Sequence, residues 1–284
     1  MIKMKKYKEF IIKTSPFNTE ILSGLMWELN ISGLEEEESF IKIFSADDSL
    51  SKNGINIFLK KLIGEKIINE FSVEELEIEN KNWNEEWEKN LQVIKVTDRI
   101  VIKPSSKSYI PNKKEIILTI DPKMSFGTGE HQTTKLMLRL IEKCVRPGMK
   151  VLDIGSGTAV LAIAAVKLGA ANAIAIDNDE ICFENGNENI SLNNVEDKVE
   201  IKIGELKEIK ENNFDLIVAN IQKNILLNIS YDIGNRLNKN GLVILSGLLA
   251  EDEEDILSRY KETGLYFIEK EKMDEWIAIV FALK

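Results

Sequence analysis

The sequence predicts an α/β protein with a doubly wound, mostly parallel sheet, preceded by a small α+β domain. A short apolar strand ends on Asp153, a turn with glycines at Gly155 and Gly157 follows, and an alanine- and leucine-rich helix comes next. Only glycine permits so sharp a turn with room for a ligand, and the helix start offers free N–H groups. Later strands are near-continuous apolar runs, typical of a sheet covered on both faces. A nucleotide-like ligand is therefore expected at the carboxyl ends of the strands.

The elements of the large domain alternate along the chain. Strands are expected at residues 99–103, 115–120, 150–153, 173–177, 199–203, 214–220, 241–246 and 275–281. Helices are expected at residues 133–143, after the glycine turn, at 180–193, between 220 and 237, and in the acidic stretch after 246.

The first 75 residues have a different texture. Strands at 8–13 and 40–44, a helix capped by Asn18, a second helix at 53–63 and a further strand at 69–73 predict a compact ferredoxin-like β-α-β arrangement. We therefore expect an N-terminal recognition domain at 1–75, a linker helix at 76–97 and a catalytic domain at 98–284. Trp83 and Trp87 are expected on one face of that linker helix. They would either anchor the helix to a domain or contact a ligand.

Composition narrows the function classes. The chain has 284 residues, is 44% hydrophobic and carries a net charge of −10, which disfavours direct binding to nucleic acid. It has no apolar run of about 20 residues, so no membrane span is expected, and its start does not resemble a secretory signal. Cys144 and Cys182 fit no metal or disulfide spacing, so a cytoplasmic protein is expected, with monomer as the default.

The details of the turn favour one nucleotide-like ligand. A dinucleotide fingerprint has a third glycine where Val160 stands, which weakens the dehydrogenase interpretation. Asp153 precedes the turn where a cationic group would sit, and the next strand ends on Asp177, at a spacing that suits a carboxylate on ribose hydroxyls. S-adenosylmethionine carries an ammonium and a sulfonium but no pyrophosphate. The alternatives are an ordinary βα turn and, for Asp177, a helix N-cap.

Three further segments carry candidate chemistry. The loop from Asp121 to Thr134 is rich in glycine and hydroxyl residues and contains His131, the only histidine, as a positioning group or a general base. Glu205 and Leu206 follow a strand where adenine would lie, unless they form a simple turn. Asn220 ends another strand, where its amide could accept an N–H bond from an incoming amine and aim its lone pair. The alternative for Asn220 is a helix cap.

These residues resemble the ribosomal protein L11 methyltransferases (PrmA) over most of the chain. The resemblance rests on Trp83-x-x-x-Trp87, the Phe126-Gly-Thr-Gly-x-His-x-Thr-Thr134 loop, Val151-Leu-Asp-Ile-Gly155, Val218-Ala-Asn-Ile221, Leu245-Ser-Gly-Leu248 and Glu275-Trp276. The glycine–threonine–glycine–histidine loop is more specific than the turn, which many methyltransferases share.

The resemblance implies a class I (Rossmann-like) methyltransferase with a ferredoxin-like N-terminal domain that recognises its substrate. It implies methyl transfer from S-adenosylmethionine to lysine ε-amines and the N-terminal α-amine of ribosomal protein L11, free or on the ribosome. Asn220 and His131 are then the catalytic candidates. The cofactor-binding candidates are Phe126, Gly127, Thr128, His131, Thr134, Asp153, Gly155, Gly157, Asp177, Glu205, Leu206 and Asn220.

The chain departs from the family pattern at three places. Ala159 stands at a usual glycine, Gln132 at a common proline, and Gln222-Lys223 where the family tends to have Leu-Ala. The last change lies beside the expected acceptor channel, so it bears on substrate more than on cofactor. Three rival functions stay open: a methyltransferase for another protein, small molecule or RNA, a non-catalytic nucleotide-binding module, and a nicotinamide dehydrogenase.

Overall fold

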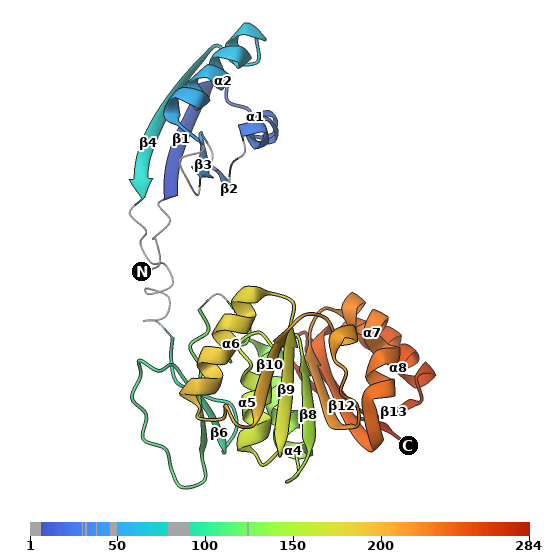
Figure 1. The fold of residues 1–284 in the computed structure, drawn as a ribbon. Coiled ribbons are helices and arrows are strands. Elements are labelled where there is room, and N and C mark those ends of the chain that lie inside the picture. Colours follow the sequence, from blue (N-terminus) through green and yellow to red (C-terminus); the bar gives the residue numbers. More distant parts are fainter. Residues whose placement is uncertain are drawn as a thin grey trace. The chain divides into compact units, whose positions relative to one another are not determined.

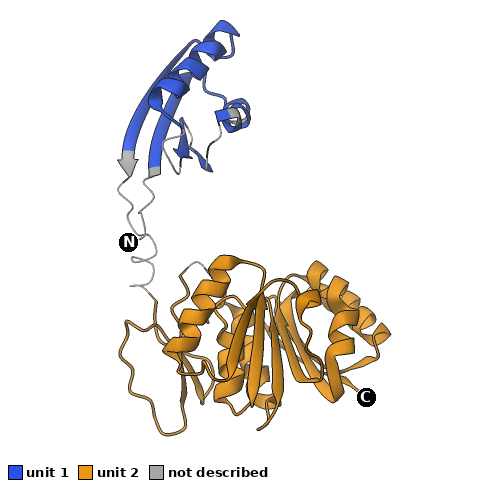
Figure 2. Ribbon diagram, viewed as in Figure 1, with its two compact units in different colours: residues 1–83 blue, residues 84–284 orange. Residues whose placement is uncertain are grey.

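The computed structural model describes residues 7–29, 31, 33–37, 39–45, 50–78, 91–123 and 125–284. The chain divides into two compact units, residues 1–83 and 84–284 (Figure 2). No helix among the described residues is long and apolar enough to cross a membrane.

The first unit is an antiparallel sheet with two helices. Its strands have the order β2-β3-β1-β4. The elements are β1 (Tyr7–Ser15), α1 (Thr19–Met26), the 3₁₀ turn η1 (Trp27–Leu29), β2 (Gly33–Glu36), β3 (Ile41–Ser45), α2 (Lys52–Gly64) and β4 (Glu70–Ile78). Phe10 and Ile12 lie two residues apart on β1 and are fully buried, opposite Ile43 and Ile41 of β3. Residues two apart on a strand share one face, so this face of β1 forms the core.

The order β-α-β-β-α-β is that of the split βαβ arrangement. The strand β2 was not expected from the sequence, because Gly-Leu-Glu-Glu lacks an alternating apolar pattern. It pairs with β3 at the edge of the sheet. The predicted linker helix at 76–97 needs correction at both ends. β4 continues to Ile78, paired with β1, and Ile94–Lys95 forms β5. Residues 79–90, with both linker tryptophans, lie outside the described residues.

The second unit contains a seven-stranded sheet with the order β10-β9-β8-β11-β12-β14-β13 (Figure 1). Its strands are β8 (Lys150–Ile154), β9 (Asn172–Asp177), β10 (Val199–Ile203), β11 (Phe214–Asn220), β12 (Leu237–Leu249), β13 (Leu265–Met273) and β14 (Trp276–Leu283). The first five are parallel, whereas β14 runs antiparallel between β12 and β13. The predicted doubly wound sheet is confirmed. The strand β13 was missed because its middle is exposed and charged.

Helices cover both faces of this sheet (Figure 1). They are α4 (Gln132–Cys144), α5 (Val160–Lys167), α6 (Glu180–Leu192), α7 (Lys223–Arg236) and α8 (Glu253–Glu262), with the 3₁₀ turns η2 (Leu206–Glu208) and η3 (Ala250–Asp252). The helices α4, α5 and α6 share one apolar cluster with the sheet, and α7 and α8 share the other. Successive residues of each central strand go to opposite clusters, which explains the unbroken apolar runs. The sheet order reverses between β8 and β11, so a ligand crevice is expected at their carboxyl ends.

A small sheet of β5, β6 (Ile100–Lys103) and β7 (Ile116–Thr119) precedes α4. The end of β7 and the segment after it are held by two asparagines one turn apart, Asn189 on α6 and Asn193 at the C-cap of that helix. The Asn189 amide accepts from the Asp121 N–H at 2.9 Å and donates to the Thr158 carbonyl at 3.1 Å, and Asn193 bonds both backbone groups of Thr119. The backbone that leads into the glycine-rich loop thus receives from these side-chain amides the hydrogen bonds that a neighbouring strand would otherwise supply.

Replacing Asn189 by alanine is expected to lower the free energy of unfolding by about 2–3 kcal/mol. The reason is that a backbone N–H and a carbonyl lose their partner where water is excluded. Urea unfolding measures the loss. Asn187→Ala is the control, since that exposed amide donates only to the Phe183 carbonyl. It should change stability by less than about 0.5 kcal/mol, and equal losses in the two variants would contradict this role for Asn189.

Candidate active site

The glycine turn between β8 and α5 is built from left-handed backbone. Gly155, Gly157 and Ala159 have φ values of 69°, 52° and 61°. A Cβ at Gly157 would lie 2.3 Å from the Phe126 carbonyl oxygen, so only glycine fits there. Ala159 adopts the same conformation at a cost of about 1–2 kcal/mol, which gives a physical reason why this position suits glycine.

The predicted glycine-rich loop docks on this turn. Thr158 donates its backbone N–H to the Phe126 carbonyl and its hydroxyl to the Gly127 carbonyl, both at 2.9 Å. Thr158 is fully buried. Two segments 31 residues apart therefore form one rigid unit. The hydroxyl of Thr128 makes a contact within the loop, where it accepts the Glu130 N–H at 3.1 Å.

Asp177 organises the turn from the end of β9. One carboxylate oxygen accepts the Gly157 N–H at 2.9 Å and the other accepts the Asp179 N–H at 3.1 Å. The cap of α6 is Asp179, whose carboxylate accepts the Ile181 N–H. The alternative interpretation of Asp177 as the helix N-cap is therefore wrong.

A cavity of about 420 Å³ opens at the carboxyl ends of β8, β9 and β10, beside α7. This volume lies in the range of small-ligand sites. Four predicted residues line it, namely Gly155, Asp177, Glu205 and Leu206. Its other lining residues are Ile154, Ile176, Asn178, Gly204, Lys207, Ile221, Ile225, Asn228, Ile229 and Asp232. The lining residues in α7 and just before it were missed, although Ile221, Ile225 and Ile229 recur every four residues, a helical spacing that the sequence displays.

Asp153 lies behind the turn and does not line this cavity. Its side chain is fully buried, one oxygen accepts the Ala162 N–H at 3.0 Å, and the other has no partner in the described part of the chain. Burial raises the pKa of Asp153 to about 7, and the neighbouring Asp177 carboxylate adds to the rise. A bound cation would reverse this effect by favouring the charged form.

Asn220 ends β11 and is oriented by Thr133 of α4. The Asn220 amide nitrogen donates to the Thr133 hydroxyl oxygen at 3.2 Å, and that hydroxyl lies 2.8 Å from His131 Nδ1. Nδ1 also accepts the Thr133 N–H at 3.3 Å, so the hydroxyl donates to it and the imidazole proton of the neutral ring is on Nε2. Asn220 Oδ1 is buried and has no hydrogen-bond partner among the described residues. Thr133 was not expected from the sequence to take this position.

His131 is the N-cap of α4 and lies between two aromatic rings. Its ring centroid is 5.4 Å from that of Phe126 and 4.9 Å from that of Trp276, both in edge contact. Phe126 is 52% exposed, so this aromatic group forms part of the molecular surface beside Asn220. The predicted residues thus gather in two adjoining groups, the cavity and the Asn220–Thr133–His131 chain.

Several buried polar atoms around the turn have no hydrogen-bond partner among the described residues. They include Thr134 Oγ1, Asp153 Oδ1, Ser156 Oγ and Asn220 Oδ1. Unpaired buried polar groups are costly in the folded protein. A ligand with an ammonium and a carboxylate could satisfy the first three of these atoms. The donor set therefore fits S-adenosylmethionine.

Lys223, one of the two residues after Ile221 that depart from the family pattern, has a structural role. Lys223, the first residue of α7, forms ion pairs with Asp252 at 2.9 Å and Asp255 at 2.7 Å. These carboxylates raise the pKa of Lys223 to about 12. Its cation ties α7 to α8 and does not line the cavity.

The sheet order and this site define a Rossmann-like methyltransferase that depends on S-adenosylmethionine. Comparison with known proteins agrees, because the family model "Ribosomal protein L11 methyltransferase (PrmA)" matches residues 21–284. The chain belongs to the ribosomal protein L11 methyltransferase family. The expected resemblance and the expected cofactor are thereby confirmed, and the dehydrogenase alternative is wrong.

Individual relatives support the same assignment. A ribosomal protein L11 methyltransferase of Clostridium botulinum is 36% identical over 271 residues, which are 92% of this chain and 85% of that protein. One of Caldicellulosiruptor saccharolyticus is 33% identical and covers 97% and 99%. A crystal structure of ribosomal protein L11 methylase from Lactobacillus delbrueckii subsp. bulgaricus superimposes with a TM-score of 0.65 at 32% identity, over 68% of this chain and 100% of that one.

Proposed function

We propose that this enzyme methylates lysine ε-amines and the N-terminal α-amine of ribosomal protein L11. The observation that carries the proposal is Asn220, whose amide nitrogen donates to Thr133 while its Oδ1 accepts no hydrogen bond from any residue that the structure describes. An acceptor oxygen fixed in this way suits an amine N–H. The names of the relatives, which cover most of this chain, supply the substrate.

The cofactor, when bound, supplies a methyl group activated on a sulfonium. Asp177 and Leu206 would hold its ribose and adenine, and Asp153, Thr134 and Ser156 would receive its polar end. These roles rest on the lining of the cavity and on the unpartnered buried atoms.

The protein's remaining task is to present a neutral, correctly aimed amine. Removing the proton of a lysine with a pKa of about 10.4 costs roughly 4–5 kcal/mol at pH 7. The aromatic surface of Phe126, His131 and Trp276 favours the neutral form by excluding water. Asn220 accepts one N–H and so aims the lone pair, and such orientation supplies several kcal/mol. We assign His131 a positioning role, since its Nδ1 is occupied by Thr133.

Mass spectrometry of L11 incubated with enzyme and S-adenosylmethionine tests this proposal. The expected result is mass added in whole methyl groups at lysines and at the N-terminus. Methylation of another protein, of RNA or of a small molecule, with none on L11, would assign a different acceptor. We keep L11 free or on the ribosome as the expected partner, and cytoplasm as the expected location.

The buried carboxyl of Asp153 predicts a pH dependence. Its pKa is about 7 in the folded protein and about 4 in the unfolded chain. Its stabilising contribution is therefore complete below about pH 4 and is lost as pH rises through 7. The Asp153→Asn variant lacks this loss. Between pH 4 and 7, the free energy of unfolding of the variant should therefore rise relative to that of the wild type. Above pH 7 the difference between the two proteins should stay constant.

Denaturant unfolding over this pH range, without cofactor, measures the difference. Asp197→Asn, a change at an exposed carboxyl of the same unit, is the control. A constant difference between Asp153→Asn and wild type at every pH would contradict the prediction.

A further inference from the structure

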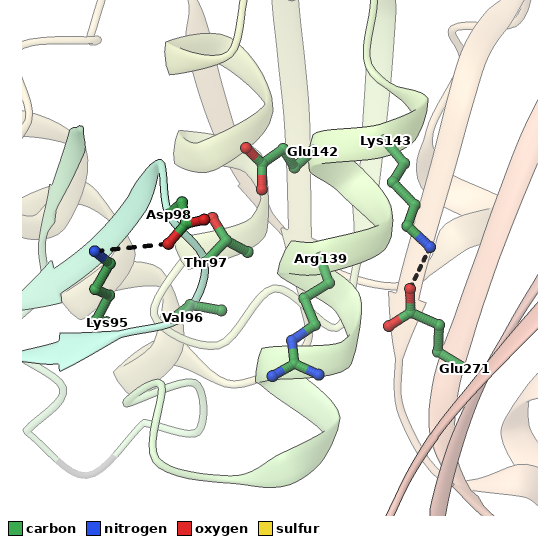
Figure 3. A pocket seen from close by; sticks show the side chains of 8 residues that line it. All are labelled: Lys95, Val96, Thr97, Asp98, Arg139, Glu142, Lys143 and Glu271. Atoms are coloured by element: carbon green, nitrogen blue, oxygen red, sulfur yellow. Dashed lines mark hydrogen bonds and ion pairs between the residues drawn. The ribbon is translucent and has the colours of Figure 1, made fainter. Parts of the chain in front are cut away.

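A second cavity, of about 630 Å³, lies beside α4 and shares no lining residue with the cofactor cavity (Figure 3). Three segments of the second unit form it: the residues from β5 to β6, the C-terminal half of α4, and β13. The lining residues are Lys95, Val96, Thr97, Asp98, Arg139, Glu142, Lys143 and Glu271. We call it the α4 groove.

The carboxylates of the α4 groove already have cationic partners. Asp98 pairs with Lys95 at 3.7 Å, and Glu142 pairs with Arg99 at 3.7 Å. Glu271 binds Lys143 in the contact drawn in Figure 3. Each of these three acids therefore has a cationic partner among the described residues.

Arg139 is the exception in the α4 groove. Its guanidinium has no hydrogen bond or ion pair to any described residue, although the side chain is half-buried. Five N–H donors in a rigid fork match a carboxylate in two parallel bonds. Thr97 also lines the groove. Its hydroxyl oxygen accepts the N–H groups of Arg99 and Ile100, so its proton remains to be donated.

We propose that the α4 groove binds an acidic side chain of the protein acceptor, whose carboxylate pairs with Arg139. The identity of this partner rests on the proposed function. A polypeptide fits better than a nucleic acid, because a row of phosphates would meet Asp98, Glu142 and Glu271 as well. The net charge of −10 also repels a polyanion. A single carboxylate on a chain of mixed charge neutralises Arg139 without that repulsion.

The helix α4 connects this groove to the candidate active site. Thr133, which orients Asn220, lies in its first turn, and Arg139 lies six residues further on. At 1.5 Å per residue the rise between them is about 9 Å. A rigid helix therefore fixes the spacing between an anchored carboxylate and the target amine. Arg139 acts here as an anchor for the acceptor and takes no part in methyl transfer.

Steady-state methylation of L11 tests the inference. Arg139→Gln should raise KM for L11 about 10-fold, the effect of one lost charge-assisted contact. The kcat and the dissociation constant for S-adenosylmethionine should stay within twofold of wild type. Arg139→Lys should restore affinity only in part, since ammonium cannot form the paired bonds. Lys261→Gln, an exposed cation on α8, removes the same charge and should leave KM unchanged.

Two further measurements separate the possible failures. With a short acceptor peptide that contains lysine but no acid, Arg139→Gln and wild type should have equal KM. Fluorescence anisotropy of a labelled hexapeptide with one glutamate among glycine and serine residues, without any methyl transfer, should show binding to wild type that Arg139→Gln weakens. If L11 is not methylated at all, the proposed function fails while the hexapeptide result still decides the groove. Equal affinity of the two proteins for the hexapeptide, or loss of kcat in Arg139→Gln, would overturn the inference. Displacement of the hexapeptide by single-stranded RNA would also overturn it.

Discussion

Replacing Asn220 by alanine is expected to lower kcat at least about 100-fold, close to 3 kcal/mol of barrier, while cofactor affinity changes less than threefold. The amide would aim the acceptor amine, and loss of one oriented polar group or a displacement of about 1 Å costs this much. The side chain lies at the end of β11 and does not line the cofactor cavity. Single-turnover methylation measures kcat, and calorimetry measures binding of S-adenosylmethionine.

Thr133 provides a graded comparison for Asn220. Thr133→Val keeps the shape but removes the hydroxyl between the Asn220 amide and His131, so the amide can rotate. We expect about a 10-fold loss of kcat, with cofactor affinity unchanged, and recovery in Thr133→Ser. If Asn220→Ala loses cofactor affinity and turnover in parallel, the residue is a structural cap and its assignment is wrong.

Replacing Gly157 by alanine is expected to weaken cofactor binding at least about 10-fold. The new Cβ would lie 2.3 Å from the Phe126 carbonyl, so the loop that Thr158 holds against the turn must move. The left-handed φ adds about 1–2 kcal/mol of strain. The same change disturbs the N–H that Asp177 accepts. Calorimetry with S-adenosylmethionine, together with thermal unfolding, measures both effects.

Gly148→Ala is the matched control for the strain. Gly148 also has a left-handed φ, of 88°, but a Cβ there meets nothing within 4 Å. It should lose stability by a similar amount of strain while cofactor affinity stays unchanged. Equal affinities in the Gly157 and Gly148 variants would show that the close approach of the loop is unimportant for binding.

The sequence predicted the core elements of the site because their signals are local. The apolar strand before Asp153, the glycine spacing and the acid at the end of β9 lie within one crossover unit. The exposed or polar strands β2 and β13 were not predicted, since neither has an alternating apolar pattern. β12 is also longer than expected, because it begins at Leu237 opposite Phe214 of β11.

Local sequence patterns could not identify residues whose role depends on a contact with a residue far away in the chain. Nothing near Thr133 in the chain indicates that its hydroxyl meets Asn220, 87 residues later. The α7 isoleucines have a visible helical spacing, but this spacing alone suits a buried face equally well. The roles of the individual site residues remain predictions that the variants above can test.

By itself, the sequence determined the kind of ligand-binding unit: a buried parallel sheet whose strands end in a glycine turn and acids. It could do so because backbone conformation and apolar periodicity depend on neighbours a few residues away. Only the tertiary structure decided that Asp153 is sealed behind the turn, that Thr133 orients Asn220, and that Arg139 has no partner among the described residues. These facts depend on which helix face meets which strand end, and packing of the whole domain sets that choice.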